Sequence, residues 1–237
     1  MNINFIKKNL TIIVLCGGKG ERLKPLTNTT PKPLIKINNE TILFRILKHL
    51  IYYKLNHFII ASGYKSDKIK KFIKKKKEFS NIKVLYTGKD TDIISRIQKC
   101  LPYSKDNILI CYGDTLLDIN INKLINFYLL YRNKIIVTAF NLKTNFGILK
   151  ISSSNTVVKF LEKPNLNLWI NVGFILLNKK YYNLLFKFKT FKNFLISIGY
   201  KKIFKAFKHL GKHITINTLS ELEEAKKNIK LLKINKL

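Results

Sequence analysis

Between residues 11 and 141 the sequence alternates short apolar segments, typical of strands, with longer amphipathic segments, typical of helices. The strand-like segments are rich in β-branched residues and cover Thr11–Cys16, His57–Ala61, Ile82–Tyr86, Asn107–Tyr112 and Lys134–Asn141. The helix-like segments have apolar residues at three- and four-residue spacing and cover Thr41–Leu55, Ser66–Lys77, Thr91–Leu101 and Ile119–Tyr131. This alternation predicts an α/β fold with a doubly wound, mostly parallel, Rossmann-like sheet, and Ser66 is the expected N-cap of its helix.

After residue 141 the alternation stops, and three strand-like segments follow one another without helices between them. These segments cover Phe146–Ile151, Thr156–Glu162 and Trp169–Leu177. Helical spacing returns around 179–187 and 190–208, and a short strand at His213–Ile216 precedes a final helix at Leu219–Leu232. The sequence has no internal repeat and no Ser/Gly-rich linker, so we expect one domain over residues 1–237.

The formal net charge of +32 allows two interpretations. A basic surface can bind nucleic acid or an anionic membrane, and the basic, aromatic-rich runs at 69–79 and 188–209 keep that possibility open. However, only four of the 45 cations are arginines, alanine is scarce, and the abundant Lys, Asn, Ile, Phe and Tyr all have A/T-rich codons. We therefore interpret most of the charge as compositional, with lysines spread over solvated faces, and expect no nucleic-acid partner.

The lengths of the apolar runs and the spacing of the cysteines indicate the cellular compartment of the protein. No apolar run reaches the roughly 18–20 residues that a membrane span needs. The basic stretch MNINFIKKNL leads into a short apolar run, which we interpret as a buried strand rather than a signal peptide. Cys16, Cys100 and Cys111 lack CxxC spacing, which suits a reducing compartment. We therefore expect a cytoplasmic protein without a disulfide framework or a zinc site.

The segment LCGGKGERLKPLTNTTPKPL (15–34) places a glycine-rich turn directly after the first strand. Backbone N–H groups in such a turn are free to face phosphate, and glycine permits a close approach. The segment lacks the GK[ST] ending of a Walker A loop and the third glycine of a GxGxxG fingerprint. Arg22 and Lys32 follow the turn, and Pro31 and Pro33 stiffen the backbone around Lys32. This arrangement favours phosphoryl chemistry over a purely structural turn.

The pattern L-x-G-G-x-G-x-R-L, followed by a Thr/Pro-rich stretch and P-K-P-L, resembles the signature of the sugar-1-phosphate nucleotidylyltransferases. Further segments similar to this family occur in its order: VLYTGKDTDIISRIQ (84–98), YGDTLLDIN (112–120), NFGILK (145–150), FLEKP (160–164), INVGFILL (170–177) and FKHLGKHITINTLSELEEAKK (207–227). The blocks Thr87–Ile97 and Tyr112–Ile119 are most similar to the glucose-1-phosphate cytidylyltransferase branch. The resemblance covers nearly the whole chain.

The resemblance implies a reaction and assigns roles to residues of the opening segment. A sugar-1-phosphate oxygen would attack the α-phosphorus of a nucleoside triphosphate (NTP) and release pyrophosphate. Gly17, Gly18 and Gly20 would cradle the triphosphate. Arg22 would clamp the leaving pyrophosphate, and Lys32 would bridge the two reacting phosphates.

The resemblance also implies a Mg²⁺ cofactor. Asp114, at the end of a predicted strand, would bind the ion, which prefers carboxylate and phosphate oxygens. The family's second metal ligand is an aspartate that precedes Thr-Leu, where this sequence has Asn217. Asparagine offers a carbonyl oxygen but no charge, so we expect a working enzyme with slow turnover. The alternative for Asp114 is a turn or helix-capping aspartate.

The remaining implied contacts involve the sugar and the base. Lys163 would hold the sugar phosphate, Glu162 and Asn171 would bond the sugar hydroxyls, and Gly147 would leave room for the ring. Arg96 would face the base or its ribose. The alternative for Glu162 and Lys163 is an exposed loop.

We therefore expect a nucleotide-binding half over about 1–141, and a sugar-binding half with a small β-rich insertion and C-terminal helices over about 142–237. The favoured reaction joins CTP and glucose 1-phosphate to give CDP-glucose. Alternatives are GTP with a heptose 1-phosphate, UTP or dTTP with a hexose 1-phosphate, or a degenerate relative that binds nucleotide sugars without turnover. A homo-oligomer is also expected, with the Phe-rich stretch 188–209 as either a subunit contact or core.

Overall fold

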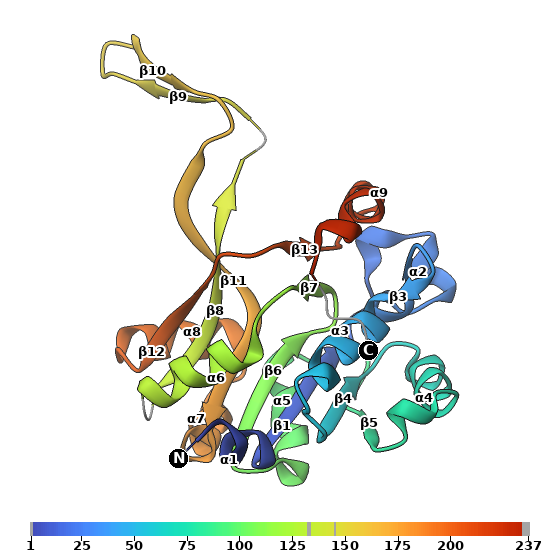
Figure 1. Cartoon of the computed structure of the whole chain (residues 1–237). Coiled ribbons are helices and arrows are strands. Elements are labelled where there is room, and N and C mark those ends of the chain that lie inside the picture. The colour runs from blue at the N-terminus through green and yellow to red at the C-terminus, as the bar shows by residue number, and fades with distance from the viewer. Residues whose placement is uncertain (1, 132–133, 145, 234–237) are drawn as a thin grey trace.

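A computed structural model describes residues 2–131, 134–144 and 146–233 of the chain (Figure 1). Its central sheet has seven strands in the order β12-β8-β11-β6-β1-β4-β5. Four of them, β6 (Asn107–Tyr112), β1 (Leu10–Cys16), β4 (Phe58–Ser62) and β5 (Ile82–Tyr86), pair in parallel. Strand β11 (Asn165–Asn178) is antiparallel to both of its neighbours, β6 and β8 (Ile135–Lys143), and β12 (Phe204–His209) pairs parallel to β8. The sheet is therefore mostly parallel, as predicted.

Helices cover both faces of this sheet because alternate residues of the central strands are buried in two different cores. Ile12 and Val14 of β1 pack in one cluster with α3 (Ile42–Tyr52) and α6 (Ile121–Leu130). Ile13, between them, packs in the other cluster with α5 (Ile93–Cys100) and α8 (Phe191–Tyr200). The remaining α-helices are α1 (Ile3–Lys8), α2 (Leu26–Thr29), α4 (Ser66–Lys74), α7 (Tyr182–Phe186) and α9 (Leu219–Asn228). This two-sided burial confirms the doubly wound, Rossmann-like class.

Three two-stranded pairs complete the sheet structure. Strands β2 (Lys36–Ile37) and β3 (Glu40–Thr41) pair near the Lys32 loop, and β7 (Thr115–Leu117) pairs antiparallel with β13 (His213–Thr215). The third pair, β9 (Ile148–Ile151) with β10 (Val157–Leu161), is a hairpin at the end of an arm that projects from the body (Figure 1). The exposed apolar side chains of its two strands are Leu149, Ile151, Val157, Val158 and Phe160.

The structure corrects three local expectations. The predicted helix over 190–208 ends at Tyr200, and β12 follows, because residues 204–209 are extended and pair with β8, from Phe204 opposite Ile135 to His209 opposite Phe140. Lys205 and Lys208 charge this edge strand, which discourages pairing with another chain. Ser66 is the first helical residue rather than the N-cap, and its hydroxyl bonds to that of Ser62. The N-terminal helix α1 was not predicted.

The Phe-rich stretch 188–209 contributes to the core. Phe191 and Phe194 of α8 are buried and stack on each other with ring centroids 5.9 Å apart. This observation favours the core interpretation of the stretch, and the homo-oligomer stays a prediction. Within the described residues, no helix is both long enough and apolar enough to cross a bilayer.

Candidate active site

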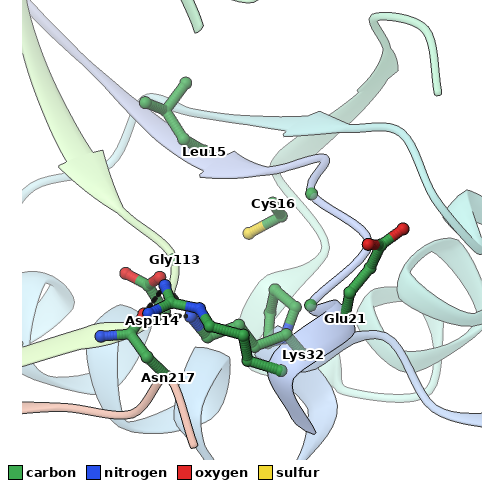
Figure 2. Close-up of a pocket in the computed structure, with 11 residues that line it drawn as sticks. Leu15, Cys16, Glu21, Lys32, Gly113, Asp114 and Asn217 are labelled. Carbon is green, nitrogen blue, oxygen red and sulfur yellow. Dashed lines mark hydrogen bonds and ion pairs between the residues drawn. The ribbon is translucent and has the colours of Figure 1, made fainter. Parts of the chain in front are cut away.

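A pocket of about 400 Å³ opens at the carboxyl ends of β1 and β6 (Figure 2). Ligands of open α/β sheets bind at this edge, where the loops after adjacent strands diverge. The residues that line the pocket are Leu15, Cys16, Gly18, Gly20, Glu21, Arg22, Lys32, Pro33, Gly113, Asp114 and Asn217. The list includes two of the three predicted glycines, both predicted cations and both predicted metal ligands.

The amino group of Lys32 is the centre of this pocket. Its Nζ lies 2.6 Å from Oδ2 of Asp114 and donates to Oδ1 of Asn217 at 3.0 Å. Arg22 donates to the same Asn217 oxygen through Nη2 at 3.2 Å. Figure 2 shows the Lys32, Asp114 and Asn217 side chains converging from separate parts of the chain. The pocket therefore presents two cations, Arg22 and Lys32, and two carboxylates, Asp114 and Glu21, to a ligand.

The backbone around Lys32 explains why its side chain is held there. Pro31 and Pro33 flank it, and residues 32–34 form a single 3₁₀ turn closed by the Leu34 N–H and the Pro31 carbonyl at 2.8 Å. The Lys32 side chain is only 14% exposed, so its stem is packed while its amino group reaches the pocket. The prediction of a rigid lysine beside the glycine turn agrees with this geometry.

The glycine loop needs glycine at two positions for different reasons. Gly20 has φ of 66°, in the left-handed region that favours glycine. A Cβ on Gly17 would overlap the guanidinium of Arg96, which donates to the Gly17 carbonyl at 3.2 Å. Gly18 faces the pocket, and a Cβ there would meet no described atom within 4 Å.

Arg96 supports this loop from behind. Its side chain is 4% exposed, and it does not belong to the set of residues lining the pocket. Besides the Gly17 carbonyl, it donates to the Gly88 carbonyl at 2.7 Å and to the Thr87 hydroxyl at 2.9 Å. This position differs from the expected contact with base or ribose, because buried carbonyls of two loops converge on the guanidinium and satisfy it there.

Thr27 and Tyr64, which sequence reasoning missed, hold the loop from the other side. Thr27 is 1% exposed and donates its hydroxyl proton to the Gly20 carbonyl at 3.0 Å. Its own carbonyl accepts a hydrogen bond from the Tyr64 hydroxyl at 3.0 Å. The signal in the sequence was the Thr/Pro-rich stretch itself, because threonine hydroxyls can bond neighbouring backbone.

Asp114 and Asn217 come from the two sides of the β7–β13 pair. Asp114 directly precedes β7, Asn217 follows β13 by two residues, and the Ile216 N–H donates to the Asp114 carbonyl at 3.2 Å. Glu221 accepts from the Thr218 N–H and forms a capping box that starts α9 and fixes this corner. The two side-chain oxygens thus share one amino group, although 103 positions of sequence separate the residues.

These oxygens are a suitable partial ligand set for Mg²⁺. Magnesium is usually held by one or two protein carboxylates, with waters and substrate phosphates completing its octahedron. Asp114 offers a carboxylate, Asn217 a carbonyl oxygen, and neither is a soft ligand that would favour zinc. Among the described residues no group of three or more His, Cys, Asp or Glu could hold a metal by itself.

The predicted sugar-binding residues do not all reach this pocket. Asn171 on β11 donates to the Tyr112 hydroxyl at 3.0 Å, and Tyr112 is two residues before Asp114. Gly147, Glu162 and Lys163 lie on the arm, and none of the described residues that line the pocket comes from there. Glu162 and Lys163 are about 60% exposed and lie 3.6 Å apart. A Cβ on Gly147 would meet the tip of the exposed Phe160 ring at 2.5 Å, so that ring would have to move to admit a larger residue.

The fold and this site define a class of protein. A glycine loop and paired cations face a carboxylate at the carboxyl edge of a Rossmann-like sheet, which is an arrangement for phosphoryl chemistry. The sequence profile of the nucleotidyl transferase family matches residues 11–221, and the chain belongs to that family, as a sugar-1-phosphate nucleotidyltransferase.

Curated relatives agree on this chemistry and differ in substrate. A Bacillus subtilis protein assigned as a glucose-1-phosphate cytidylyltransferase is 31% identical, covering 91% of this chain and 94% of its own. The D-glycero-α-D-manno-heptose 1-phosphate guanylyltransferase of Campylobacter jejuni is 32% identical, covering 81% and 86%.

Solved structures agree on the fold. HddC from Yersinia pseudotuberculosis, crystallised with GMP-PN, superposes with a TM-score of 0.69 at 21% identity over 92% of this chain and 99% of its own. A Bacillus anthracis protein assigned as a glucose-1-phosphate thymidylyltransferase gives a TM-score of 0.76 at 17% identity over 96% and 98%. At these identities the likeness supports the architecture alone.

Proposed function

We propose that the chain is a Mg²⁺-dependent cytidylyltransferase that joins CTP and glucose 1-phosphate to give CDP-glucose and pyrophosphate. The observation that carries the proposal is the Lys32 amino group, held between Asp114 and Asn217 at the mouth of the glycine loop. A cation at this point serves two phosphates that approach each other, because it lowers the repulsion between the attacking and the attacked groups.

In the proposed reaction, an oxygen of the sugar phosphate forms a bond to the α-phosphorus while the bond from that phosphorus to the bridging oxygen of pyrophosphate breaks. Lys32 pairs with both phosphates, and Arg22 pairs with the leaving pyrophosphate. The N–H groups of the glycine loop orient the triphosphate. Most of the rate gain is assigned to positioning and to charge stabilisation rather than to proton transfer.

Asp114 and Asn217 are the proposed metal ligands, with the rest of the shell supplied by nucleotide oxygens and water. When bound, Mg²⁺ would offset the negative charge that accumulates on the phosphates. Lys32 pairs with Asp114 at 2.6 Å. The Lys32 amino group therefore already lies where the phosphates of the substrates would bind.

The choice of CTP rests on the Bacillus subtilis relative, whose alignment covers more of both chains than that of the Campylobacter jejuni guanylyltransferase. The motif blocks at 87–97 and 112–119 support the same choice. GTP with a heptose 1-phosphate is the second candidate pair, and UTP or dTTP with a hexose 1-phosphate is the third.

A second candidate function, from another class, is nucleotide-sugar binding without turnover. The observation that favours it is Asn217, which brings no charge to the proposed metal site. Nucleic-acid binding through surface lysines is the weaker rival, and it would decline steeply with salt.

The testing experiment is pyrophosphate release by the purified chain, with four NTPs crossed against a panel of sugar 1-phosphates in the presence of Mg²⁺. Release with CTP and glucose 1-phosphate supports the full proposal, and release with another pair corrects the substrate while keeping the mechanism. Nucleotide binding by calorimetry without release from any pair favours the binding protein. Lys192→Ala, on the exposed face of α8, serves as a matched control for removal of a lysine charge.

A further inference from the structure

A continuous chain of hydrogen bonds leads from Asp114 away from the pocket. The Thr115 hydroxyl donates to Oδ1 of Asp114 at 3.1 Å. The hydroxyls of Thr115 and Thr215 lie 3.2 Å apart, and the Thr215 hydroxyl lies 2.7 Å from Nε2 of His213. Thr115 and Thr215 are direct partners across the β7–β13 pair, so the strand register places the two hydroxyls together.

Counting protons fixes the direction of every bond in this chain. A threonine hydroxyl has one proton, and Thr115 uses its proton on Asp114. The bond between the two hydroxyls must therefore use the proton of Thr215. Thr215 then has only lone pairs left for His213, so Nε2 of His213 must be the protonated nitrogen. All three protons point toward the carboxylate, and donors aligned in this way polarise one another.

The surroundings favour the same arrangement. Thr115 is 2% exposed, so water does not compete for its hydroxyl. Burial lowers the pKa of His213 to about 4, assisted by nearby His209 and opposed by the charge of Asp114. His213 is therefore a neutral imidazole near pH 7, and its ring is fixed against Phe140, with centroids 4.9 Å apart.

We propose that Thr115, Thr215 and His213 are positioning residues for the reaction, and that their aligned hydrogen bonds hold Oδ1 of Asp114 so that Oδ2 faces Lys32 and the metal–nucleotide complex. This inference rests on the proposed function. The two oxygens of a carboxylate are equivalent, so the group can rotate and exchange their positions. A donor that is hydrogen-bonded to one oxygen fixes the direction in which the second oxygen points. Mutation of a residue that orients a metal ligand typically lowers metal affinity or activity by about 10- to 100-fold.

The strand pair by itself does not require this chain. Leu116 and Ile214 are cross-strand partners next to the threonines, and Leu116 is 1% exposed, so apolar packing already holds β7 to β13. Valine has nearly the shape of threonine and suits a strand well. A purely structural role would therefore tolerate valine at either position, whereas the proposed role would not.

The first test uses no substrate. Long-range ¹H–¹⁵N spectra of the full chain report which imidazole nitrogen carries the proton, and the His213 signals are assigned by their loss in His213→Gln. The expected result at pH 7.5 is the Nε2–H form of His213. The Nδ1–H form or a doubly protonated ring would overturn the proposal, whatever substrate the enzyme uses.

The second test uses the valine variants. We expect Thr115→Val and Thr215→Val each to lose about tenfold in kcat and to raise the KM for Mg²⁺, while binding of metal-free nucleotide by calorimetry stays unchanged. Thr115→Ser, which keeps the donor, should recover to within about threefold of the parent. Thr138→Val is the matched control, since it removes a buried hydroxyl bonded to the Phe174 carbonyl at 3.1 Å on another strand.

The outcomes separate the explanations. If Thr115→Val keeps its kcat and its KM for Mg²⁺ within twofold of the parent, the positioning role is wrong. It is equally wrong if Thr115→Ser and Thr115→Val lose the same activity in proportion to their loss of unfolding free energy. If the parent protein turns over no substrate pair at all, the proposed function fails, and the tautomer of His213 still decides the hydrogen-bond chain.

Discussion

Nζ of Lys32 lies 2.6 Å from Oδ2 of Asp114, although the two residues are 82 positions apart in the chain. The lysine side chain is 14% exposed and the aspartate side chain 29%, so water screens the pair only partly. This pair joins the glycine-loop segment to the end of β6, and both segments line the pocket.

Removal of the Lys32 charge should abolish most catalysis. We expect Lys32→Ala to lower kcat for pyrophosphate release by about 10²- to 10³-fold, because a preorganised charge at the reacting phosphates would be lost. Lys192→Ala should stay within twofold of the parent. A Lys32→Ala protein that is correctly folded and has more than a tenth of the parent kcat would contradict the assignment.

A restored carboxylate at position 217 should improve metal use. Asn217→Asp adds a negative charge next to Arg22 and Lys32, and we expect it to lower the KM for Mg²⁺ and to raise turnover severalfold at limiting Mg²⁺. Asn81→Asp, at an exposed position remote from the pocket, adds the same charge and should change neither quantity. Equal turnover of Asn217→Asp and the parent at every Mg²⁺ concentration would count against Asn217 as a ligand.

Alanine substitutions in the glycine loop should separate the packing role of Gly17 from the ligand-binding role of Gly18. Gly17→Ala forces a methyl group onto the pinned Arg96 guanidinium, and we expect it to reduce the free energy of unfolding in urea by about 1–3 kcal/mol. Gly18→Ala meets no described atom, so its unfolding free energy should change by less than about 0.5 kcal/mol. Weaker NTP binding by the stable Gly18→Ala protein would show that the loop holds the triphosphate.

Tyr112 should affect sugar-phosphate binding through Asn171. Tyr112→Phe removes the hydroxyl that accepts from Asn171 at 3.0 Å and keeps the ring that packs on Gly173. The KM for the sugar 1-phosphate should rise about fivefold, within the range for a lost hydrogen bond, while the KM for the nucleotide stays constant. A change confined to the nucleotide would instead remove Asn171 from the sugar site.

Stability should fall in mild acid because three histidines are wholly or partly buried in their neutral form. Burial lowers the pKa of His213 to about 4 and also lowers the pKa values of His49 and His57 below the usual 6.5. Between pH 6.5 and 5 the unfolded chain therefore binds more protons than the folded chain, and stability decreases as pH falls, by about 2 kcal/mol from His213.

Urea unfolding at several pH values measures this dependence. His213→Gln should show a shallower slope, since glutamine does not titrate and its amide still offers a donor to Thr215. An unchanged slope in this variant would mean that His213 titrates normally in the folded chain.

The sequence determined the class of fold and the chemical composition of the site. Apolar runs alternating with amphipathic segments require a sheet covered on both faces, and the glycine turn with Arg22 and Lys32 could be recognised because these residues are neighbours in the chain. The segment 204–209 has no period-two alternation that would predict a strand, and its extended form depends on pairing with β8.

The way in which distant residues meet depends on tertiary packing. Arg96 was expected to face the base or its ribose. In the structure, the carbonyls of two loops converge on its guanidinium and hold it behind the glycine turn. Asn217 faces Asp114, and Thr215 faces Thr115, because β13 pairs with β7 in one register. Local periodicity fixes which face of an element is buried, whereas contacts across about 100 residues depend on packing of the whole chain, which no local pattern encodes.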